Sequence, residues 1–270
     1  MGLPLNGVNH VIAVASGKGG VGKSTVAMNL AVALSVQGLK VGLLDADIYG
    51  PSQPQMLGMA DEKPFSEDGK IITPVIAHGV KLMSMGFLME KDTPMIWRGP
   101  MVISALKQML RQVNWAPLDV LVIDMPPGTG DVQLSLAQEI PLTGAVIVST
   151  PQTVALLDAR KGLNMFRKVN VPILGVVENM SSFICPACGH EENIFDHGGA
   201  HDTATEFGVP FLGHIPLEKQ VREFTDAGKP LITHAPDSKS AAAFRQLANN
   251  VLAQIAASAH TTGPVKIVIE

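Results

Sequence analysis

The chain contains few charged residues and no cluster of basic ones. Charged residues make up 16% of its 270 residues, below the usual quarter, and no run of Lys and Arg occurs. A net charge of −4 and a pI near 6.1 likewise show no excess of basic residues. A general nucleic-acid surface needs a clustered basic footprint. We therefore expect no nucleic-acid partner.

Long apolar runs and a targeting segment are also missing. No apolar stretch approaches the roughly 18 residues of a membrane span. The first residues lack a basic region followed by an apolar one, and Asn6 breaks the myristoylation pattern. Two cysteines in so long a chain do not resemble the disulfide scaffold of a secreted protein. These absences predict a soluble cytoplasmic protein with no membrane partner.

Short apolar runs, separated by Gly and Pro, dominate the chain. Hydrophobic residues make up 46% of it, and period and punctuation predict strands at residues 11–15, 40–45, 119–124, 144–150, 172–178 and 210–215. Helical patterns fall between most of them. This alternation predicts an α/β fold, a doubly wound, mostly parallel sheet with helices on both faces. We expect a single domain over residues 1–270, with flexible termini at about 1–7 and 260–270.

Two further segments have distinct patterns. Residues 71–85 contain two apolar stretches around His78-Gly79 and predict a hairpin or an excursion at the sheet edge. Residues 238–258 carry apolar side chains at intervals of three and four, which predicts a long final helix whose stripe packs on the core.

A phosphate-binding loop follows the first predicted strand. It reads Gly17-Lys18-Gly19-Gly20-Val21-Gly22-Lys23-Ser24-Thr25 and fits G-x-x-x-x-G-K-[ST] between a strand and a helix. Small residues let backbone N–H groups point at phosphate oxygens, and the helix N-terminus adds partial positive charge. This pattern places Lys23 at the β- and γ-phosphates and the Ser24 hydroxyl on Mg²⁺.

Carboxylates follow two of the predicted strands. Asp124 ends an apolar run in the Walker B arrangement, which holds magnesium directly or through water. Asp45 and Asp47 end an earlier strand, and because side chains alternate along a strand, only one of them is expected to face the nucleotide and orient the attacking water. The run 126–130, Pro-Pro-Gly-Thr-Gly, is either a switch that senses the terminal phosphate or a rigid turn.

These motifs together carry a resemblance to a known family. The loop at 17–25 resembles the deviant Walker A of the MinD/ParA group, whose hallmark is an extra lysine at the position of Lys18. With the motifs at 45–52, 97–100, 124–131 and 178–181, the chain is similar to the Mrp/ApbC branch, whose members are iron-sulfur cluster carrier ATPases. Many members have a small domain ahead of the loop. The resemblance implies that its role is absent here or is supplied by another protein.

The resemblance implies roles for three residues. Lys18 is expected to cross a dimer interface to the partner's phosphates, Asp47 to position or activate water, and Asn179 to read the adenine edge. The charge of Lys18 supports its role at the partner's phosphates. An exposed Lys18 stays an unpaired, solvated cation unless an anion approaches it. A lysine from a second subunit would act like an arginine finger, worth roughly 10³ to 10⁵ in rate.

The only two cysteines, Cys185 and Cys188, form a C-x-x-C pair. Zinc and iron-sulfur sites normally require four ligands, and a two-fold dimer supplies the missing two. From the residues alone the site is a bridging zinc, a bridging cluster, a mononuclear site completed by His190, His197 or His201, or a redox pair. The resemblance favours a 4Fe-4S cluster, with Zn²⁺ as a substitute.

The expected function is that of a homodimeric carrier. It binds and hydrolyses ATP with Mg²⁺, holds a labile cluster between its subunits and passes it to apo iron-sulfur proteins. Two alternatives stay open: a MinD/ParA-like positioning ATPase, which would need a membrane-seeking helix or a DNA-binding patch, and an ATPase whose dimer is held together by a structural zinc.

Overall fold

The computed structural model describes residues 5–88 and 99–261, and the strands in those ranges form one sheet. The strands are β1 (Val8–Ala15), β2 (Val41–Asp45), β3 (Val75–Ala77), β4 (Val80–Ser84), β5 (Leu118–Asp124), β6 (Gly144–Ser149), β7 (Ile173–Ile184), β8 (Glu191–Glu192) and β9 (Phe211–Leu217). Their order is β3-β4-β2-β5-β1-β6-β7, with β9 beside β7 and β8 paired with the end of β7. Only β3 and β8 pair antiparallel, so the mostly parallel sheet predicted from the sequence is confirmed.

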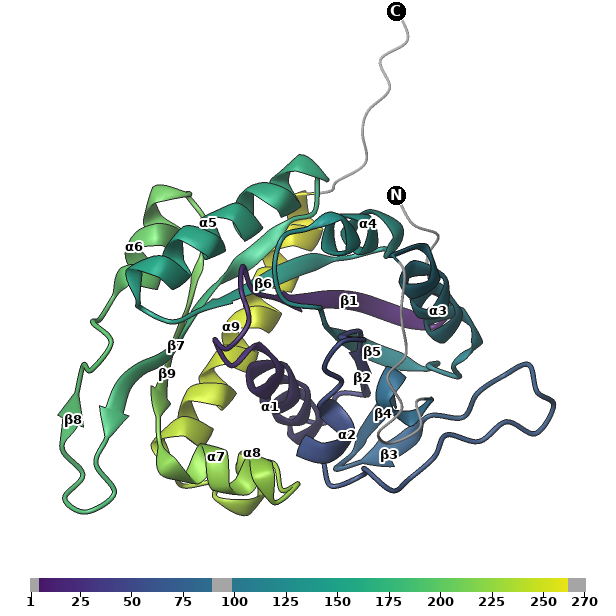
Figure 1. Cartoon of the computed structure of the whole chain (residues 1–270), viewed down its shortest axis with the longest axis horizontal. Coiled ribbons are helices and arrows are strands. Elements are labelled where there is room, and N and C mark those ends of the chain that lie inside the picture. The colour runs from purple at the N-terminus through teal and green to yellow at the C-terminus, as the bar shows by residue number, and fades with distance from the viewer. Residues whose placement is uncertain (1–4, 89–98, 262–270) are drawn as a thin grey trace, which may run out of the picture.

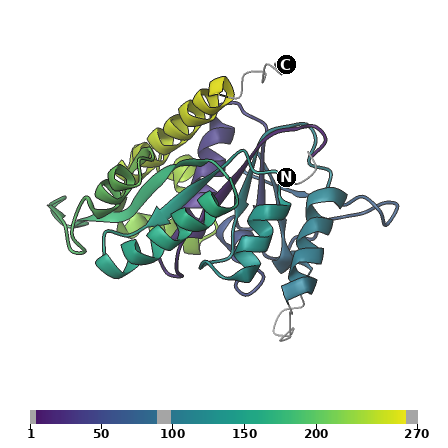
Figure 2. The ribbon, with the colours of Figure 1, turned by 90° about the horizontal axis from the view of Figure 1, so that it is seen from above.

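Helices cover both faces of this sheet (Figures 1 and 2). One layer holds α1 (Lys23–Val36), α2 (Gln53–Met56), α7 (Lys219–Asp226), α8 (Leu231–His234) and α9 (Lys239–Thr261). The other holds α3 (Gly99–Gln112), α4 (Asp131–Glu139), α5 (Thr153–Lys168) and α6 (Gly199–Glu206). Parallel strands need such crossovers, and with both faces covered their residues are apolar throughout. Strands β2 and β6 are buried along their whole length.

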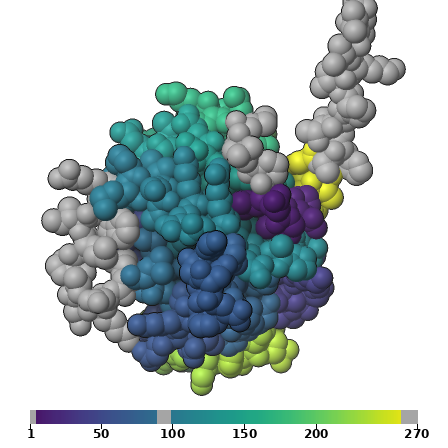
Figure 3. All heavy atoms as spheres, turned by 90° about the vertical axis from the view of Figure 1, so that its right-hand side faces the viewer, coloured from purple at the N-terminus to yellow at the C-terminus, as the bar shows by residue number. Residues whose placement is uncertain are grey.

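The predicted hairpin around residues 71–85 is confirmed. Strands β3 and β4 join through His78 and Gly79, both at positive φ, as a tight two-residue turn requires. Strand β4 then pairs in parallel with β2, and a short 3-10 helix, η1 (Met85–Phe87), follows it. The segment that precedes β3 is held by backbone hydrogen bonds between Ile72 and residues at the end of α3. It forms part of the surface seen in Figure 3.

Several element boundaries differ from the sequence predictions, among them the start of β1 at Val8 and the end of β9 at Leu217. The prediction ended one strand at residue 178, but β7 continues to Ile184 because it pairs with β9 as far as Phe183 and with β8 beyond. The final helix α9 spans Lys239–Thr261 rather than 238–258. Buried apolar residues from both helix layers form one core around the sheet.

The predicted flexible termini fall largely on residues 1–4 and 262–270, outside the described residues, as do Trp97 and Arg98 of the motif at 97–100. The side chain of Leu5 packs against the core. None of the helices in the described ranges combines the length and apolar character that a transmembrane segment requires.

Candidate functional site

The carboxyl ends of the central strands meet at one edge of the sheet. In register, Val14 on β1 lies beside Asp124 on β5, which in turn lies beside Asp45 on β2. Ligands of open parallel sheets bind at this edge. Strand pairing therefore brings together the two strand-end aspartates, Asp45 and Asp124, that were predicted from separate motifs.

The loop at residues 16–22 joins β1 to α1, which begins at Lys23; the predicted order of strand, loop and helix is confirmed. Gly20 and Gly22 have φ of 82° and 79°, a conformation that costs an L-residue roughly 1–2 kcal/mol. At Gly17 a Cβ would lie 2.0 Å from the carbonyl oxygen of Asp158 in α5. Glycine is thus required here both for backbone conformation and for close packing of the loop.

Behind this loop, Lys23 forms a buried ion pair with Asp124. The ammonium nitrogen of Lys23 also lies 3.1 Å from the Ser24 hydroxyl. Gln53, at the start of α2, donates from Nε2 to Asp124 Oδ2 at 2.8 Å and to the Ser24 carbonyl at 3.0 Å. Its own Oε1 is buried without a hydrogen-bond partner among the described residues. The Walker A lysine and the Walker B aspartate therefore share one buried polar cluster.

Asp45 and Asp47 have different environments, and the reasoning about strand alternation does not apply to them because β2 ends at Asp45. Asp45 is fully buried and accepts hydrogen bonds from the backbone N–H groups of residues 47, 52 and 53 and from the Ser84 hydroxyl. Burial, reinforced by the charge of Asp124, raises the pKa of Asp45 to about 7. Its donors make it a structural carboxylate that holds the turn after β2.

Asp47 is half-buried and lines a cavity of about 220 Å³ over the loop. Burial raises the pKa of its carboxyl, and the charge of Lys23 opposes that shift. The remaining lining residues are Ser16, Lys18, Gly19, Gly20, Gly22, Lys23, Ser24, Thr25 and Pro127. Asp47 therefore lines this cavity, whereas Asp45, the last residue of β2, does not.

A second cavity, of about 240 Å³, shares Gly22 and Thr25 with the first. Asn179, Met180 and Pro216 form one wall, and α7 contributes Val221, Arg222, Thr225 and Asp226. The two adjoining cavities together form a trench beside the phosphate loop. The mostly apolar second cavity suits the planar base of a nucleotide.

Asn179 lies within β7, whereas the sequence prediction ended this strand at residue 178. Its Nδ2 donates to the carbonyl of Val21 at 2.8 Å, and a Cβ on Gly22 would lie 2.1 Å from this nitrogen. The side chain therefore connects the phosphate loop to the wall of the second cavity.

Lys18 is half-buried at the mouth of the first cavity. Its carbonyl accepts a hydrogen bond from the Ser16 hydroxyl at 2.8 Å. Within the ranges that the structure describes, its ammonium group has no hydrogen bond or ion pair. The run at 126–130 packs nearby, where the N–H of Gly128 donates to the Ser16 carbonyl at 2.9 Å.

The two cysteines lie in the turn between β7 and β8, which projects from the body of the molecule (Figure 1). The backbone pairs Cys185 N–H with the His190 carbonyl at 2.9 Å and Gly189 N–H with the Cys185 carbonyl at 2.8 Å. Cys188 is exposed and Cys185 partly so. Neither is in a disulfide.

Comparisons with known proteins agree with this arrangement. The family model of the ParA type described as the NUBPL iron-transfer P-loop NTPase matches residues 7–252. The chain belongs to this family. It is 56% identical over 251 residues to the iron-sulfur cluster carrier protein of Haemophilus influenzae, a match that covers 93% of this chain and 68% of that protein.

Solved structures of similar fold extend the comparison. The nucleotide-binding protein of Archaeoglobus fulgidus, in complex with ADP, is 39% identical, with a TM-score of 0.74 over 83% of this chain and 88% of that one. The cell division ATPase MinD of Pyrococcus furiosus is 24% identical, with a TM-score of 0.65 over 91% and 99%. The second likeness shows the fold alone. The predicted resemblance to iron-sulfur carriers of the MinD/ParA group is confirmed.

Sequence reasoning about this NUBPL-type P-loop NTPase missed three sets of residues. Gln53 carries no motif signal, because its partners Ser24 and Asp124 are 29 and 71 residues away in the chain. The wall formed by α7 was missed for the same reason. A third group, Glu178 with His197 and His214, also comes together only in the folded chain.

Proposed function

We propose that this P-loop NTPase is a homodimeric iron-sulfur cluster carrier that uses ATP. The observation that carries the proposal is the exposed Cys185/Cys188 pair, held at the tip of a projecting hairpin in a chain that also has a nucleotide-binding trench. A cluster bound at a projecting, solvent-accessible turn is available to a recipient protein. The name of the Haemophilus influenzae relative supports the same cargo.

The cysteine turn favours thiolates, the form that binds metal. Backbone N–H groups of Ala187 and Cys188, together with the Cys188 thiol, hold the pKa of the Cys185 thiol below its usual value. Two thiolates are half of the four that a 4Fe-4S cluster requires. A two-fold dimer that brings two such hairpins together completes the set, and the cluster is then the cargo passed to an apo-protein.

The nucleotide half of the proposal rests on the buried polar cluster behind the loop. The Ser24 hydroxyl and the Asp124 carboxylate both contact the ammonium of Lys23, so these oxygens already converge on a cation. Hard oxygen donors of this kind fit Mg²⁺, which would be held by Ser24 and Asp124 and would neutralise phosphate charge. Lys23 would then bind the β- and γ-phosphates, Asp47 would orient water, and Asn179 would contact adenine.

In a dimer, Lys18 of one subunit would act at the phosphates bound by the other. Its ammonium group faces the phosphate cavity without a partner among the described residues, so approach of a second trench offers it an anionic partner. Strand β7 connects this chemistry to the cargo, because Asn179 lies on this strand and Cys185 directly follows its last residue, Ile184. We infer that ATP favours one arrangement of the dimer, through a higher affinity for that state than for the other.

Anaerobic reconstitution with iron and sulfide tests the carrier role. We expect the wild-type chain to gain a visible cluster absorption band with about two iron atoms per chain, which is one four-iron cluster per dimer. Cys185→Ala and Cys188→Ala should abolish the band. Glu192→Ala, in the same hairpin and exposed, is the matched control and should keep it.

The same experiment distinguishes a carrier from a structural zinc protein. A wild-type chain that takes up only zinc, or that holds a cluster but never passes it to an apo-ferredoxin, would contradict the proposal. Loss of the band in Glu192→Ala would show that the hairpin fold, rather than the thiolates, had been measured.

The in-trans role of Lys18 is tested by steady-state hydrolysis. Lys18→Ala should bind ATP nearly as well as wild type but lose on the order of 10³-fold or more in turnover. That is the rate contribution of an arginine finger in phosphoryl transfer. Lys70→Ala removes an exposed lysine from a loop and should leave turnover unchanged. Undiminished hydrolysis by Lys18→Ala would remove the assignment.

A further inference from the structure

Glu178 is a fully buried carboxylate on β7, and its surroundings include no Lys or Arg partner among the described residues. Its two oxygens accept hydrogen bonds from the N–H groups of Gly198 at 3.1 Å and Ala200 at 2.9 Å, at the start of α6. These donors satisfy one lone pair on each oxygen. Since a carboxylate offers about four acceptor positions, part of its capacity stays free.

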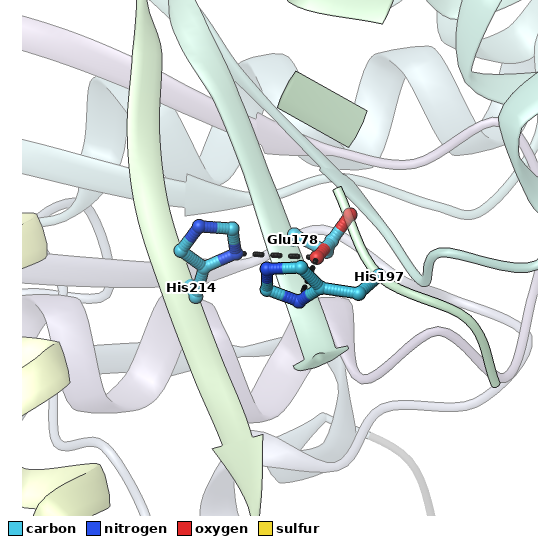
Figure 4. A group of neighbouring side chains, drawn as sticks. All are labelled: Glu178, His197 and His214. Carbon is cyan, nitrogen blue, oxygen red and sulfur yellow. Dashed lines mark hydrogen bonds and ion pairs between the residues drawn. The ribbon is translucent and has the colours of Figure 1, made fainter. Parts of the chain in front are cut away.

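Two imidazoles converge on this carboxylate (Figure 4). His214 is the register partner of Glu178 on the neighbouring strand β9, so both side chains emerge on the same face of the sheet. Its Nδ1 lies 3.1 Å from Glu178 Oε1, and Nδ1 of His197, from the loop before α6, lies 3.9 Å from the same oxygen. The two rings stack, with centroids 5.0 Å apart.

We propose that Glu178, His197 and His214 form a mononuclear site for a divalent transition metal. One oxygen and two nitrogen donors have ligand atoms within 4.8 Å of one another. Imidazole with carboxylate suits Zn²⁺, Co²⁺ and related ions. Metal-to-ligand distances of about 2.0–2.1 Å place tetrahedral ligands about 3.4 Å apart, and the observed 3.1 and 3.9 Å bracket that spacing.

Hydrogen bonding alone accounts for only part of this geometry. His214 is within hydrogen-bond distance of Glu178, whereas His197 at 3.9 Å is beyond it and still aims the same ring nitrogen at the same oxygen. A metal ion between the three groups would accept all of these lone pairs, with the Nε2 protons of both rings left outward. Side-chain exposures of 52% for His197 and 40% for His214 give an ion access from solvent.

The site depends on neither the cysteine pair nor the nucleotide trench, so it goes beyond the proposed carrier function. Glu178 is next to Asn179 on β7, and His197 belongs to the loop that leads into α6. A bound ion would therefore join β7, β9 and the start of α6. It would lie near the middle of β7, the strand that leads into the cysteine hairpin.

Cobalt titration of the cysteine-free chain tests the site. Cys185→Ala/Cys188→Ala removes every thiol of the chain. Purified without a histidine tag and freed of metal by chelation, it should bind one Co²⁺ per chain by calorimetry and develop a visible d–d absorption band. Adding His197→Gln or His214→Gln should weaken Co²⁺ binding at least tenfold, since even partners outside the first coordination sphere contribute 10–100-fold.

His201→Gln is the matched control. His201 is exposed on α6, and its ring packs edge-on against Phe211 while its Nδ1 lies 3.4 Å from Asp202. This variant should keep the full affinity. No Co²⁺ binding by the cysteine-free chain, unchanged affinity in either His197→Gln or His214→Gln, or an equal loss in His201→Gln would each overturn the proposal. Far-UV circular dichroism of every variant ensures that folded chains are compared.

Discussion

Replacing Gly22 by alanine tests the reasoning about the phosphate loop most directly. Gly22 has a φ of 79°, and a Cβ built there would lie 2.1 Å from Nδ2 of Asn179. Gly20 has nearly the same φ, 82°, but a Cβ there has no neighbour within 4 Å. The two glycines therefore share the backbone cost of alanine and differ only in the steric contact.

The expected magnitudes follow from this difference. Positive φ costs an alanine roughly 1–2 kcal/mol, and this is the whole cost of Gly20→Ala. In Gly22→Ala the side chain of Asn179 must also move, which breaks its 2.8 Å hydrogen bond to the Val21 carbonyl. Leaving a buried acceptor unsatisfied adds about 1–3 kcal/mol. Gly22→Ala should therefore destabilise the fold by about 2–5 kcal/mol.

Urea unfolding without nucleotide, followed by far-UV circular dichroism, measures these free energies. A double-mutant cycle with Asn179→Ala isolates the contact, because in that background Gly22→Ala should cost no more than Gly20→Ala. The cycle should give a coupling of about 1–3 kcal/mol between positions 22 and 179. Equal destabilisation by the two glycine substitutions, or a coupling near zero, would refute the reasoning.

Two further predictions concern the polar cluster around the loop. Because the folded chain binds a proton at Asp45 more tightly than the unfolded chain, with a pKa of about 7 instead of 3.8, stability should fall as the pH rises from about 4 to about 7 and then level off. Asp45→Asn should flatten this decrease in chelated samples unfolded with urea at several pH values; an unchanged slope would contradict it. Gln53→Ala removes the donor to Asp124 and to the Ser24 carbonyl and should lower the free energy of unfolding by about 1–3 kcal/mol per lost partner. The control Gln55→Ala, at an exposed position, should change it little. Equal urea midpoints for the two variants would argue against a role for Gln53.

The fold was predictable because its signals are local. Short apolar runs alternate with helical patterns, and a parallel sheet buried on both faces requires that composition. The hairpin at His78-Gly79 followed from its turn residues. The end of β7 was not predictable, because residues 179–184 extend the strand only where β8 and β9 supply hydrogen-bond partners.

The candidate site divides in the same way. The proximity of Lys23, Ser24 and Asp124 was predictable, because their motifs have fixed positions at the ends of two strands. Which of Asp45 and Asp47 lines the cavity was not predictable. The answer depends on β2 ending at Asp45 and on the hydrogen-bond donors of residues 52, 53 and 84, which hold the Asp45 carboxylate. The functions of Lys18 and of the cysteine pair stay predictions, because both require a second chain.

By itself the sequence determined the family, the parallel α/β architecture, the glycine-rich loop between the first strand and the first helix, and the spacing of its two cysteines. Each of these depends on residues close together in the chain, where composition and spacing carry the signal. Only the tertiary structure decided that Gln53 contacts Asp124, that Asn179 lies against Gly22, and that Glu178 gathers two histidines from separate elements. Those contacts join residues up to 157 positions apart, from Gly22 to Asn179. They form only when loops and helices from distant parts of the chain pack at the edge of the paired strands, which the sequence around each residue does not show.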